Sequence, residues 1–420
     1  MPSPFPERFF WGAATAAHQV EGNNANSDFW ALEQLPGSPF REPSGDACDH
    51  YHRYRQDIAL LAKIGLNSYR FSIEWARIEP EEGVFSSEAI AHYHDVLLTC
   101  YEHHLTPIVT LHHFTSPRWL RGVGGWLDTR TPARFAAYAR RITEELGDLL
   151  QYVCTVNEAN ITSVIALTVN RESGEQTNQS NASLNAPVGV QQGVLDTPLA
   201  NPLSVLTNPQ IGQALLAAHQ LARPAIKAVN PAIQVGLTLA LPDLQSAEGG
   251  AARLKQIERE VYLKYIEALQ GDDFLGVQTY TRSIIGPNGV EPHPAGAELT
   301  QMGYEFYPEG LEGTLRRVAR HTDLPLLVSE NGIATDDDTR RVEYIRRAVA
   351  GMRRCVADGL PIWGYLYWSA LDNFEWMLGY APHFGLIAVN RRTQERGVKG
   401  SAYFLGSLAR TTLHGEGAIS

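Results

Sequence analysis

The chain has few cysteines and no long apolar run, and each absence excludes a class of protein. Four of its 420 residues are cysteines, and none of them forms a C-x-x-C pair. Four scattered thiols in a chain of this length do not make a disulfide framework. The first residues show no basic stretch followed by an apolar one, as a secretory signal would, and no apolar run approaches the roughly 20 residues that span a bilayer. We therefore expect a soluble cytoplasmic protein.

A concentrated basic surface is also missing. The chain carries 35 Lys and Arg against 46 Asp and Glu, a net charge of −11 with histidine neutral. An acidic chain repels phosphate backbones unless its basic residues gather in one patch. The densest basic pairs, at 353–354 and 391–392, are typical of solvated helix and loop faces. We therefore expect a small neutral molecule as the partner, and neither nucleic acid nor a membrane; the sequence does not indicate an oligomeric state.

Signatures of a bound metal or nucleotide are missing as well. The 14 histidines include no H-E-x-x-H motif. His92 and His94 stand two residues apart and would not face one another on a helix. The Asp-His-x-His stretch at 49–52 is a weak candidate for a divalent ion. The glycine-rich stretch 122–125 lacks the lysine of a phosphate-binding loop. We therefore predict no cofactor and no metal.

What the chain does contain is a regular alternation of β-rich and helical segments. Hydrophobic residues make up 44% and charged residues 19%, an ordinary globular mix. The β-rich segments are 10–20, 67–73, 107–113, 152–158, 234–240, 274–280, 325–330 and 362–369. Alternation of this kind is typical of α/β proteins with a parallel sheet. Eight units in one run predict a closed (β/α)₈ TIM barrel, and no linker divides it, so we expect residues 1–420 to form a single catalytic domain.

One polar segment interrupts this pattern. Residues 170–208 are rich in Asn, Gln, Ser, Gly and Pro and follow the fourth predicted strand. In a barrel, loops that follow strands lie at the C-terminal face, where active sites are found. We therefore expect extended loops over that face, with 170–208 among them and without an assigned role.

Two glutamates end predicted strands that a closed barrel would bring across one pocket. They are Glu158, on the fourth strand, and Glu330, on the seventh. Two facing carboxylates are what glycoside cleavage needs, because one protonates the leaving oxygen and the other handles the oxocarbenium-like carbon. Arg70, at the end of the second strand, can hold a carboxylate ionised, and Tyr280, ending the sixth, can donate a hydrogen bond to it.

Other polar and aromatic residues near the strand ends fit a sugar site. Asn157 and Asn331 each adjoin one of the two glutamates and can hydrogen-bond a sugar hydroxyl. Trp368 and Trp376 offer flat faces on which a sugar ring can stack, whereas Trp363 is more typical of core packing.

Nearly the whole chain resembles glycoside hydrolase family 1, the retaining β-glucosidase family. The matching motifs, in chain order, are FFWGAATAAHQVEG at 9–22, YRFSIEWARI at 69–78, TVNE at 155–158, SENG at 329–332 and WSALDNFEW at 368–376. The resemblance implies a TIM barrel that removes terminal non-reducing β-D-glucosyl residues from small β-glucosides or cello-oligosaccharides. It implies a double displacement with a covalent intermediate, in carbohydrate metabolism and cellulose degradation.

The resemblance also assigns roles by position. Glu158 would be the acid/base and Glu330 the nucleophile, with Arg70 and Tyr280 in support. The implied substrate-binding residues are Gln19 and Glu375 for the hydroxyls at the far side of the sugar, His113 and Asn157 for the 2- and 3-hydroxyl region, Trp368 as the platform under the ring, and Trp376 near O3 or O4.

The sequence departs from the family pattern in residues 170–208, which look little like the family's usual loop, and at three further sites. Ala159 stands where proline usually follows the acid/base, Phe114-Thr115 replace Trp-Asp after the binding histidine, and Gln278-Thr279 replace Asn-Tyr before Tyr280. The catalytic pair is unchanged. The departures bear on the leaving-group side of the pocket, so the resemblance does not imply a particular aglycone.

Several alternatives to a β-glucosidase follow from the same residues. Galactose or fucose could replace glucose, and transglycosylation could accompany hydrolysis. A barrel that only binds sugar would lack one carboxylate, and a thioglucosidase would carry Gln in place of Glu158. A 6-phospho-β-glucosidase is disfavoured, because Glu375 would repel the phosphate and residues 377–384 contain no lysine.

Overall fold

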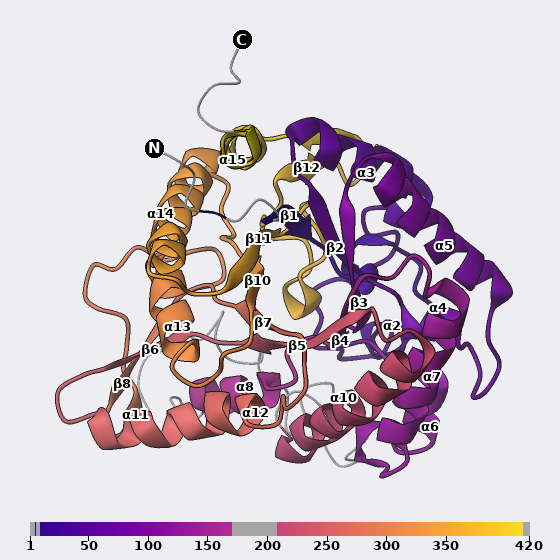
Figure 1. The fold of residues 1–420 in the computed structure, drawn as a ribbon, viewed down its shortest axis with the longest axis horizontal. Coiled ribbons are helices and arrows are strands. Elements are labelled where there is room, and N and C mark those ends of the chain that lie inside the picture. The colour runs from indigo at the N-terminus through magenta and orange to yellow at the C-terminus, as the bar shows by residue number, and fades with distance from the viewer. Residues whose placement is uncertain (1–4, 6–8, 170–207, 415–420) are drawn as a thin grey trace.

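The structure is a computed structural model that describes residue 5, residues 9–169 and residues 208–414. Eight parallel strands close into a barrel in the order β1-β11-β10-β7-β5-β4-β3-β2 (Figure 1). They are β1 (Phe10–Ala14), β2 (Ser68–Ser72), β3 (Thr106–His112), β4 (Tyr152–Val156), β5 (Gln234–Ala240), β7 (Phe274–Gln278), β10 (Leu326–Asn331) and β11 (Ile362–Trp368). The predicted TIM barrel is confirmed. Its extent as one domain over 1–420 stays a prediction, and the polar segment at 170–207 lies outside the described residues.

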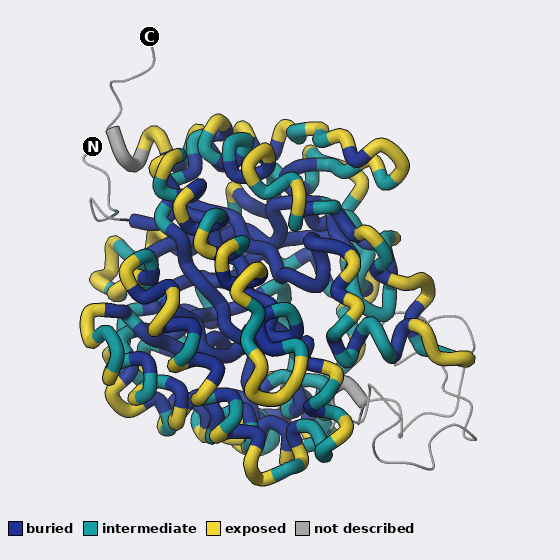
Figure 2. The backbone as a smooth tube through the Cα atoms, turned by 90° about the vertical axis from the view of Figure 1, so that its right-hand side faces the viewer, coloured by how far each residue is buried: buried dark blue, intermediate teal, exposed yellow. Residues whose placement is uncertain are grey.

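Helices surround the barrel, and the buried backbone lies inside them (Figures 1 and 2). The main ones are α3 (His50–Ile64), α5 (Ser87–Glu102), α7 (Thr131–Leu146), α10 (Pro209–Val229), α11 (Ala251–Glu258), α13 (Gly310–Val318), α14 (Asp338–Ala357) and α15 (Gly400–His414). In α7, Phe135, Tyr138, Ile142 and Leu146 are buried at helical spacing, so one face of the helix packs inward. Among the helices of the described residues, none has the length and apolar character needed to span a membrane.

Shorter elements occupy the connections. The helical ones are α1 (Ala17–Val20), α2 (Asp28–Glu33), α4 (Trp75–Ile78), α6 (Arg118–Gly122), η1 (Gly125–Leu127), α8 (Ile161–Val169), the π-helical turn η2 (Arg259–Leu263), α12 (Lys264–Ile266) and η3 (Trp376–Leu378). The extended ones are β6 (Asp243–Ser246), β8 (Arg282–Gly286) and β9 (Gly289–Val290) in one small sheet, and β12 (Ile387–Val389) with β13 (Arg396–Val398) in another.

The first strand is shorter than the sequence predicts. β1 ends at Ala14, and residues 17–20 form the helix α1 instead of extending the strand to Val20. The cause is a tertiary contact, because the Ala17 N–H donates to the Ser72 Oγ at the end of β2, at 2.7 Å. The prediction of a strand over 15–20 was therefore wrong, and the turn carries Gln19 over the end of the barrel.

Apolar side chains fill part of the barrel interior. Phe10, Ile108, Cys154, Phe274, Leu327 and Leu366 form one buried cluster. Trp363 packs against this cluster, with its ring 5.6 Å from that of Phe274. The expectation that Trp363 is a packing residue is confirmed. Several of these residues lie near the N-terminal ends of their strands, which leaves the C-terminal ends for polar side chains.

Candidate active site

Glu330 is held at both carboxylate oxygens. Arg70, on β2, donates from Nη1 to Glu330 Oε1 at 2.6 Å. Tyr280, two residues past β7, donates from Oη to Glu330 Oε2 at 2.6 Å. Charge-assisted bonds of this length are the strong class of hydrogen bond. The two donors come from separate strands, so closure of the barrel is what assembles this carboxylate site.

Arg70 is fully buried and all of its nitrogens find acceptors. Its Nη2 donates to Asn157 Oδ1 at 2.6 Å, and its Nε donates to Thr110 Oγ1 at 3.1 Å. A buried guanidinium is tolerated only when it is paired and hydrogen-bonded in this way. Arg70 therefore fixes Glu330 and Asn157 relative to one another.

Burial and the two hydrogen-bond donors act on the pKa of Glu330 in opposite directions. Burial raises the pKa of Glu330 above its ordinary value, while the Arg70 charge and the hydrogen bonds from Tyr280 and Arg70 act to lower it. Both donors stabilise the ionised carboxylate in preference to the neutral acid. An ionised carboxylate held in one orientation is suited to nucleophilic attack.

Glu158 lies in a different environment. It follows β4 by two residues, is buried, and has a left-handed backbone with φ +47°. Burial and then the nearby charge of Glu330 hold the pKa of Glu158 well above its ordinary value. No Arg70 hydrogen bond reaches it among the contacts of the described residues. A carboxyl group whose protonated form is favoured in this way is suited to donate a proton to a leaving group.

His113, Asn157 and Trp368 lie together beside this pair. The His113 and Trp368 rings stack with centroids 5.6 Å apart, and Asn157 Nδ2 lies 3.3 Å from His113 Nε2. Burial, followed by the charge of Arg70, holds the pKa of His113 well below its ordinary value, so its ring is neutral. The preceding His112 lies against Trp126 and bonds to Ser116, on the other side of the strand.

Gln19, Glu375 and Trp376 form a further part of the pocket. Gln19 Nε2 donates to Phe374 O at 2.7 Å and to Glu375 Oε2 at 3.3 Å. Burial and the charge of Glu330 raise the pKa of Glu375 to about 8. The Trp376 ring lies parallel to that of His113, with centroids 6.2 Å apart. The structure thus brings together the ten residues to which the resemblance assigns catalytic, supporting or substrate-binding roles.

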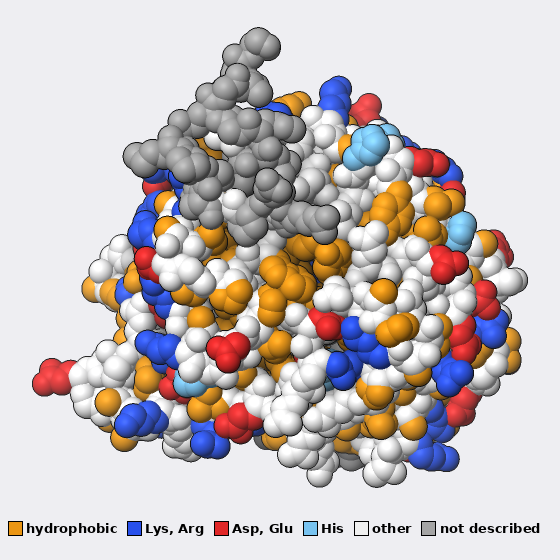
Figure 3. Space-filling view, in the orientation of Figure 1, with side chains coloured by type: hydrophobic (Ala, Val, Ile, Leu, Met, Phe, Trp, Pro, Cys, Tyr) orange, Lys and Arg blue, Asp and Glu red, His pale blue; other side chains and the backbone are white. Residues whose placement is uncertain are grey.

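Several buried polar atoms around the pocket have no hydrogen-bond partner within the described residues. They are Gln19 Oε1, His113 Nδ1, Gln278 Oε1 and Asn373 Oδ1. Buried polar groups are nearly always paired in folded proteins. A ligand rich in hydroxyl groups, such as a sugar, supplies both donors and acceptors for such atoms. In Figure 3, hydrophobic side chains gather on the middle of the face, over the barrel.

Comparison with known proteins decides the family. The model of "Glycosyl hydrolase family 1" matches residues 1–187 and 260–413. The chain belongs to glycosyl hydrolase family 1. It is 30% identical to Beta-glucosidase A of Acetivibrio thermocellus, over 95% of this chain and 97% of that protein. It is also 30% identical to a 6-phospho-beta-galactosidase of Lacticaseibacillus casei, over 98% and 99%. The crystal structure of beta-glycosidase BGL167 covers 100% of both chains at 50% identity and a TM-score of 0.89.

The predicted family and the prediction of a glycoside hydrolase enzyme are therefore confirmed. One residue that the sequence associated with sugar binding points elsewhere in this family 1 enzyme. Asn331 donates to the Thr279 carbonyl and to Tyr344 Oη, and its Oδ1 accepts from Tyr365 Oη at 2.8 Å. Because side chains alternate along a strand, Glu330 and its neighbour Asn331 lie on opposite sides of β10. Asn331 anchors the strand and is not free to bind sugar.

Other residues of the pocket carried no sequence signal. Thr238, on β5, contacts both Asn157 and Glu158 and belongs to none of the motifs. Tyr304 lies in the connection before α13, and burial and then the charges of Glu375 and Glu158 raise its pKa. Only alternation along β5 could have indicated Thr238, and nothing in the sequence pattern indicates Tyr304.

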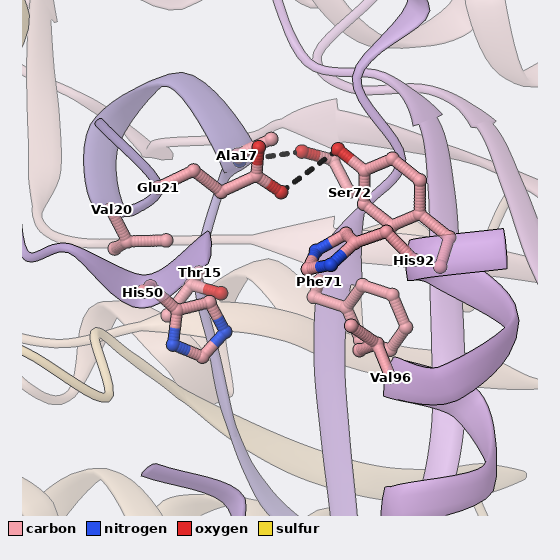
Figure 4. A pocket seen from close by; sticks show the side chains of 10 residues that line it. Thr15, Ala17, Val20, Glu21, His50, Phe71, Ser72, His92 and Val96 are labelled. Atoms are coloured by element: carbon pink, nitrogen blue, oxygen red, sulfur yellow. Dashed lines mark hydrogen bonds between the residues drawn. The ribbon is translucent and has the colours of Figure 1, made fainter. Parts of the chain in front are cut away.

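A small cavity whose lining includes neither Glu158 nor Glu330 lies between the ends of β1 and β2 and the helix α5 (Figure 4). Its polar lining is bonded internally, since Tyr93 Oη donates to Glu21 Oε1 at 2.9 Å and Ala17 N–H to Ser72 Oγ. His50 and His92 line it as well. Within the described residues, no three His, Cys, Asp or Glu side chains cluster as metal ligands would.

Proposed function

We propose that this family 1 enzyme is a retaining β-glucosidase, with Glu330 as the nucleophile and Glu158 as the acid/base. The observation that carries the proposal is the contrast between the two carboxyl groups. Glu330 accepts a hydrogen bond from Arg70 at one oxygen and from Tyr280 at the other, and both bonds favour its ionised form. Among the described residues, no Arg or Tyr side chain donates a hydrogen bond to the Glu158 carboxyl, and burial with the Glu330 charge favours its protonated form. Opposite environments for two carboxyls are the pattern of an acid and a nucleophile.

The reaction would take two steps. In the first, a Glu330 oxygen forms a bond to the anomeric carbon while the bond to the aglycone oxygen breaks, and that oxygen takes the proton of Glu158. In the second, the Glu158 carboxylate removes a proton from water, and the water oxygen displaces Glu330 from the anomeric carbon. Two inversions give overall retention. The two carboxyl groups of a retaining enzyme lie about 5–5.5 Å apart, too close for a water between them.

Glucose is the glycone that we propose, with galactose and fucose as alternatives. The chain is similar over nearly its whole length to Beta-glucosidase A of Acetivibrio thermocellus. Gln19 and Glu375, bonded to one another, offer acceptors for sugar hydroxyls at the far side of the ring. Small β-glucosides and cello-oligosaccharides would be the substrates, in carbohydrate metabolism and cellulose degradation.

A 6-phospho-β-glycosidase is the second candidate, because a 6-phospho-beta-galactosidase is among the relatives. Glu375 opposes it, because this residue presents a carboxyl group and not a cation to the 6-phosphate, and its ionised form would repel the phosphate. The stretch 377–384 provides no lysine to offset the charge.

The test is a panel of nitrophenyl β-glycosides on the purified protein, with proton NMR of the first product. We expect the β-glucoside to be cleaved best and β-glucose to appear before its anomer. Initial release of α-glucose would contradict the covalent mechanism, and preference for a 6-phosphoglucoside would favour the second candidate.

A cytoplasmic location is part of the same proposal. All four cysteines are buried and unpaired, which is usual in a reducing compartment. Fractionation of cells that express the protein, followed by immunoblotting, tests this.

A further inference from the structure

Thr238 lies at the carboxyl end of β5, fully buried, and its hydroxyl makes three hydrogen bonds. The hydroxyl accepts from the Glu158 backbone N–H at 3.2 Å and from Gln278 Nε2 at 3.3 Å. It donates to Asn157 Oδ1 at 3.1 Å. A hydroxyl has one donor and two acceptor sites, so these bonds use its full capacity. Thr238 thus touches two consecutive residues of the proposed site, one through its side chain and the other through its backbone.

The backbone contact matters because Glu158 has an uncommon conformation. Its φ of +47° lies in the left-handed region, which residues other than glycine seldom adopt. The Thr238 hydroxyl accepts from the N–H of Glu158, and the Thr238 carbonyl accepts from the N–H of Ala159 at 3.4 Å. Such conformations persist when the surrounding structure holds them. Thr238 therefore fixes the peptide groups on both sides of the Glu158 side chain.

The side-chain contact sets the direction of the Asn157 amide. Its Oδ1 accepts from Arg70 Nη2 at 2.6 Å, from Gln278 Nε2 at 2.7 Å and from Thr238 at 3.1 Å. Since donors occupy the oxygen, the amide nitrogen must point the other way, toward His113. Asn157 is then presented as a donor to the pocket.

We propose that Thr238 and Gln278 are positioning residues. Thr238 contacts and orients both Asn157 and Glu158, whereas Gln278 contacts and orients Asn157 and reaches Glu158 only through the Thr238 hydroxyl. The inference rests on the proposed function, because it needs Glu158 to be the proton donor and Asn157 to contact the sugar. The proposal assigns a different kinetic effect to each of the two residues. Loss of the Thr238 hydroxyl weakens proton donation to the leaving group, whereas loss of the Gln278 amide weakens recognition at the 2-hydroxyl.

The first experiment compares Thr238→Val with Thr238→Ser on two glucosides that differ in leaving group. For phenyl β-glucoside, which needs protonation, we expect Thr238→Val to lower kcat/KM by about 30- to 100-fold, since misplacing a catalytic group by about 1 Å costs on the order of 100-fold. For 2,4-dinitrophenyl β-glucoside the loss should stay below about fivefold. Thr238→Ser keeps the hydroxyl and should recover most of the phenyl glucoside activity.

A matched control is Thr143→Val, because Thr143 is also buried but donates to Ala139 O within α7. We expect Thr143→Val to lower Tm and to leave the dependence of kcat/KM on the leaving group unchanged. Equal loss of kcat/KM on both glucosides in Thr238→Val would show a merely structural residue and overturn the inference, as would a Thr238→Ser variant with the same selective defect.

Gln278→Leu gives a second, independent test that also serves if Thr238→Val does not fold. It should lower kcat/KM about tenfold for dinitrophenyl β-glucoside and much less for the 2-deoxyglucoside, where the 2-hydroxyl is absent. The same loss on both sugars would contradict the role of Gln278.

These failures are distinguishable from failure of the proposed function. If the unaltered enzyme does not cleave β-glucosides, or if Glu158→Ala shows no leaving-group dependence, the proposed function is wrong. If both of those results hold and the Thr238 and Gln278 variants show no selectivity, only the positioning roles are wrong.

Discussion

Replacing Tyr280 with phenylalanine tests how strongly Tyr280 favours the ionised form of Glu330. The change removes one 2.6 Å hydrogen bond to Oε2 and leaves the Arg70 bond to Oε1 in place. A hydrogen bond to a charged group contributes about 1.5–3 kcal/mol. Because one pKa unit corresponds to about 1.4 kcal/mol, the pKa of Glu330 should rise by about 1–2 units.

The sign of the effect on rate follows from the state that the bond stabilises. Tyr280 favours the carboxylate, so its loss favours the acid and requires a higher pH for ionisation. The acid limb of kcat/KM against pH should therefore move upward by about one unit or more, while the basic limb, assigned to Glu158, should move little. The assay is kcat/KM for nitrophenyl β-glucoside over the pH range in which the enzyme stays folded.

A matched control is Tyr138→Phe. The Tyr138 hydroxyl is buried and donates to the carbonyls of Ile73 and Leu111, outside the pocket. It should lower Tm without moving either limb. An acid limb that stays in place in Tyr280→Phe would refute the claim that Tyr280 helps to hold Glu330 ionised.

Three further predictions concern the carboxyl groups. Glu158→Ala should lose most activity on glucosides with poor leaving groups, and added azide should restore turnover and give a β-glycosyl azide; no rescue would count against Glu158 as acid/base. Glu158→Gln should abolish the basic limb and raise Tm relative to the unaltered enzyme at pH 7 but not at pH 4, because a buried acid with a raised pKa costs stability as pH rises above its unfolded value of about 4.5. An unchanged Tm difference between the two pH values would contradict this. Glu375→Ser should weaken hydrolysis of glucosides without creating efficient cleavage of a 6-phosphoglucoside, measured as kcat/KM for both; efficient cleavage by the unaltered enzyme would overturn the glycone assignment.

Much of the barrel was predictable because its strands are short β-rich runs between helical patterns. The catalytic end was predictable for the same reason, since residues that end parallel strands meet at one face. The segment 15–20 was not, because its helix depends on a hydrogen bond from Ala17 to Ser72 on another strand. Such a contact does not change the hydrophobic periodicity of either segment, so the sequence pattern does not indicate it.

The site residues that belong to a recognisable motif could be predicted from the sequence. The residues that contact them from strands without such a motif could not. Glu158 can be identified from its motif. Its left-handed backbone and its hydrogen bond to the Thr238 hydroxyl cannot be predicted from the sequence. Asn331 shows the converse, because this motif residue lies beside Glu330 but faces away from the pocket. The adjacent Gly332 has a packing reason, since a Cβ there would lie 1.9 Å from the Trp368 carbonyl oxygen.

The most direct test of the account is covalent trapping of the nucleophile. The enzyme is incubated with 2,4-dinitrophenyl 2-deoxy-2-fluoro-β-glucoside, which forms the glycosyl-enzyme and slows its hydrolysis, and the digest is examined by mass spectrometry. We expect one fluoroglucosyl group on the peptide that contains Glu330, and none in Glu330→Gln. Label on Glu158, or turnover without any covalent label, would contradict the assignment of Glu330.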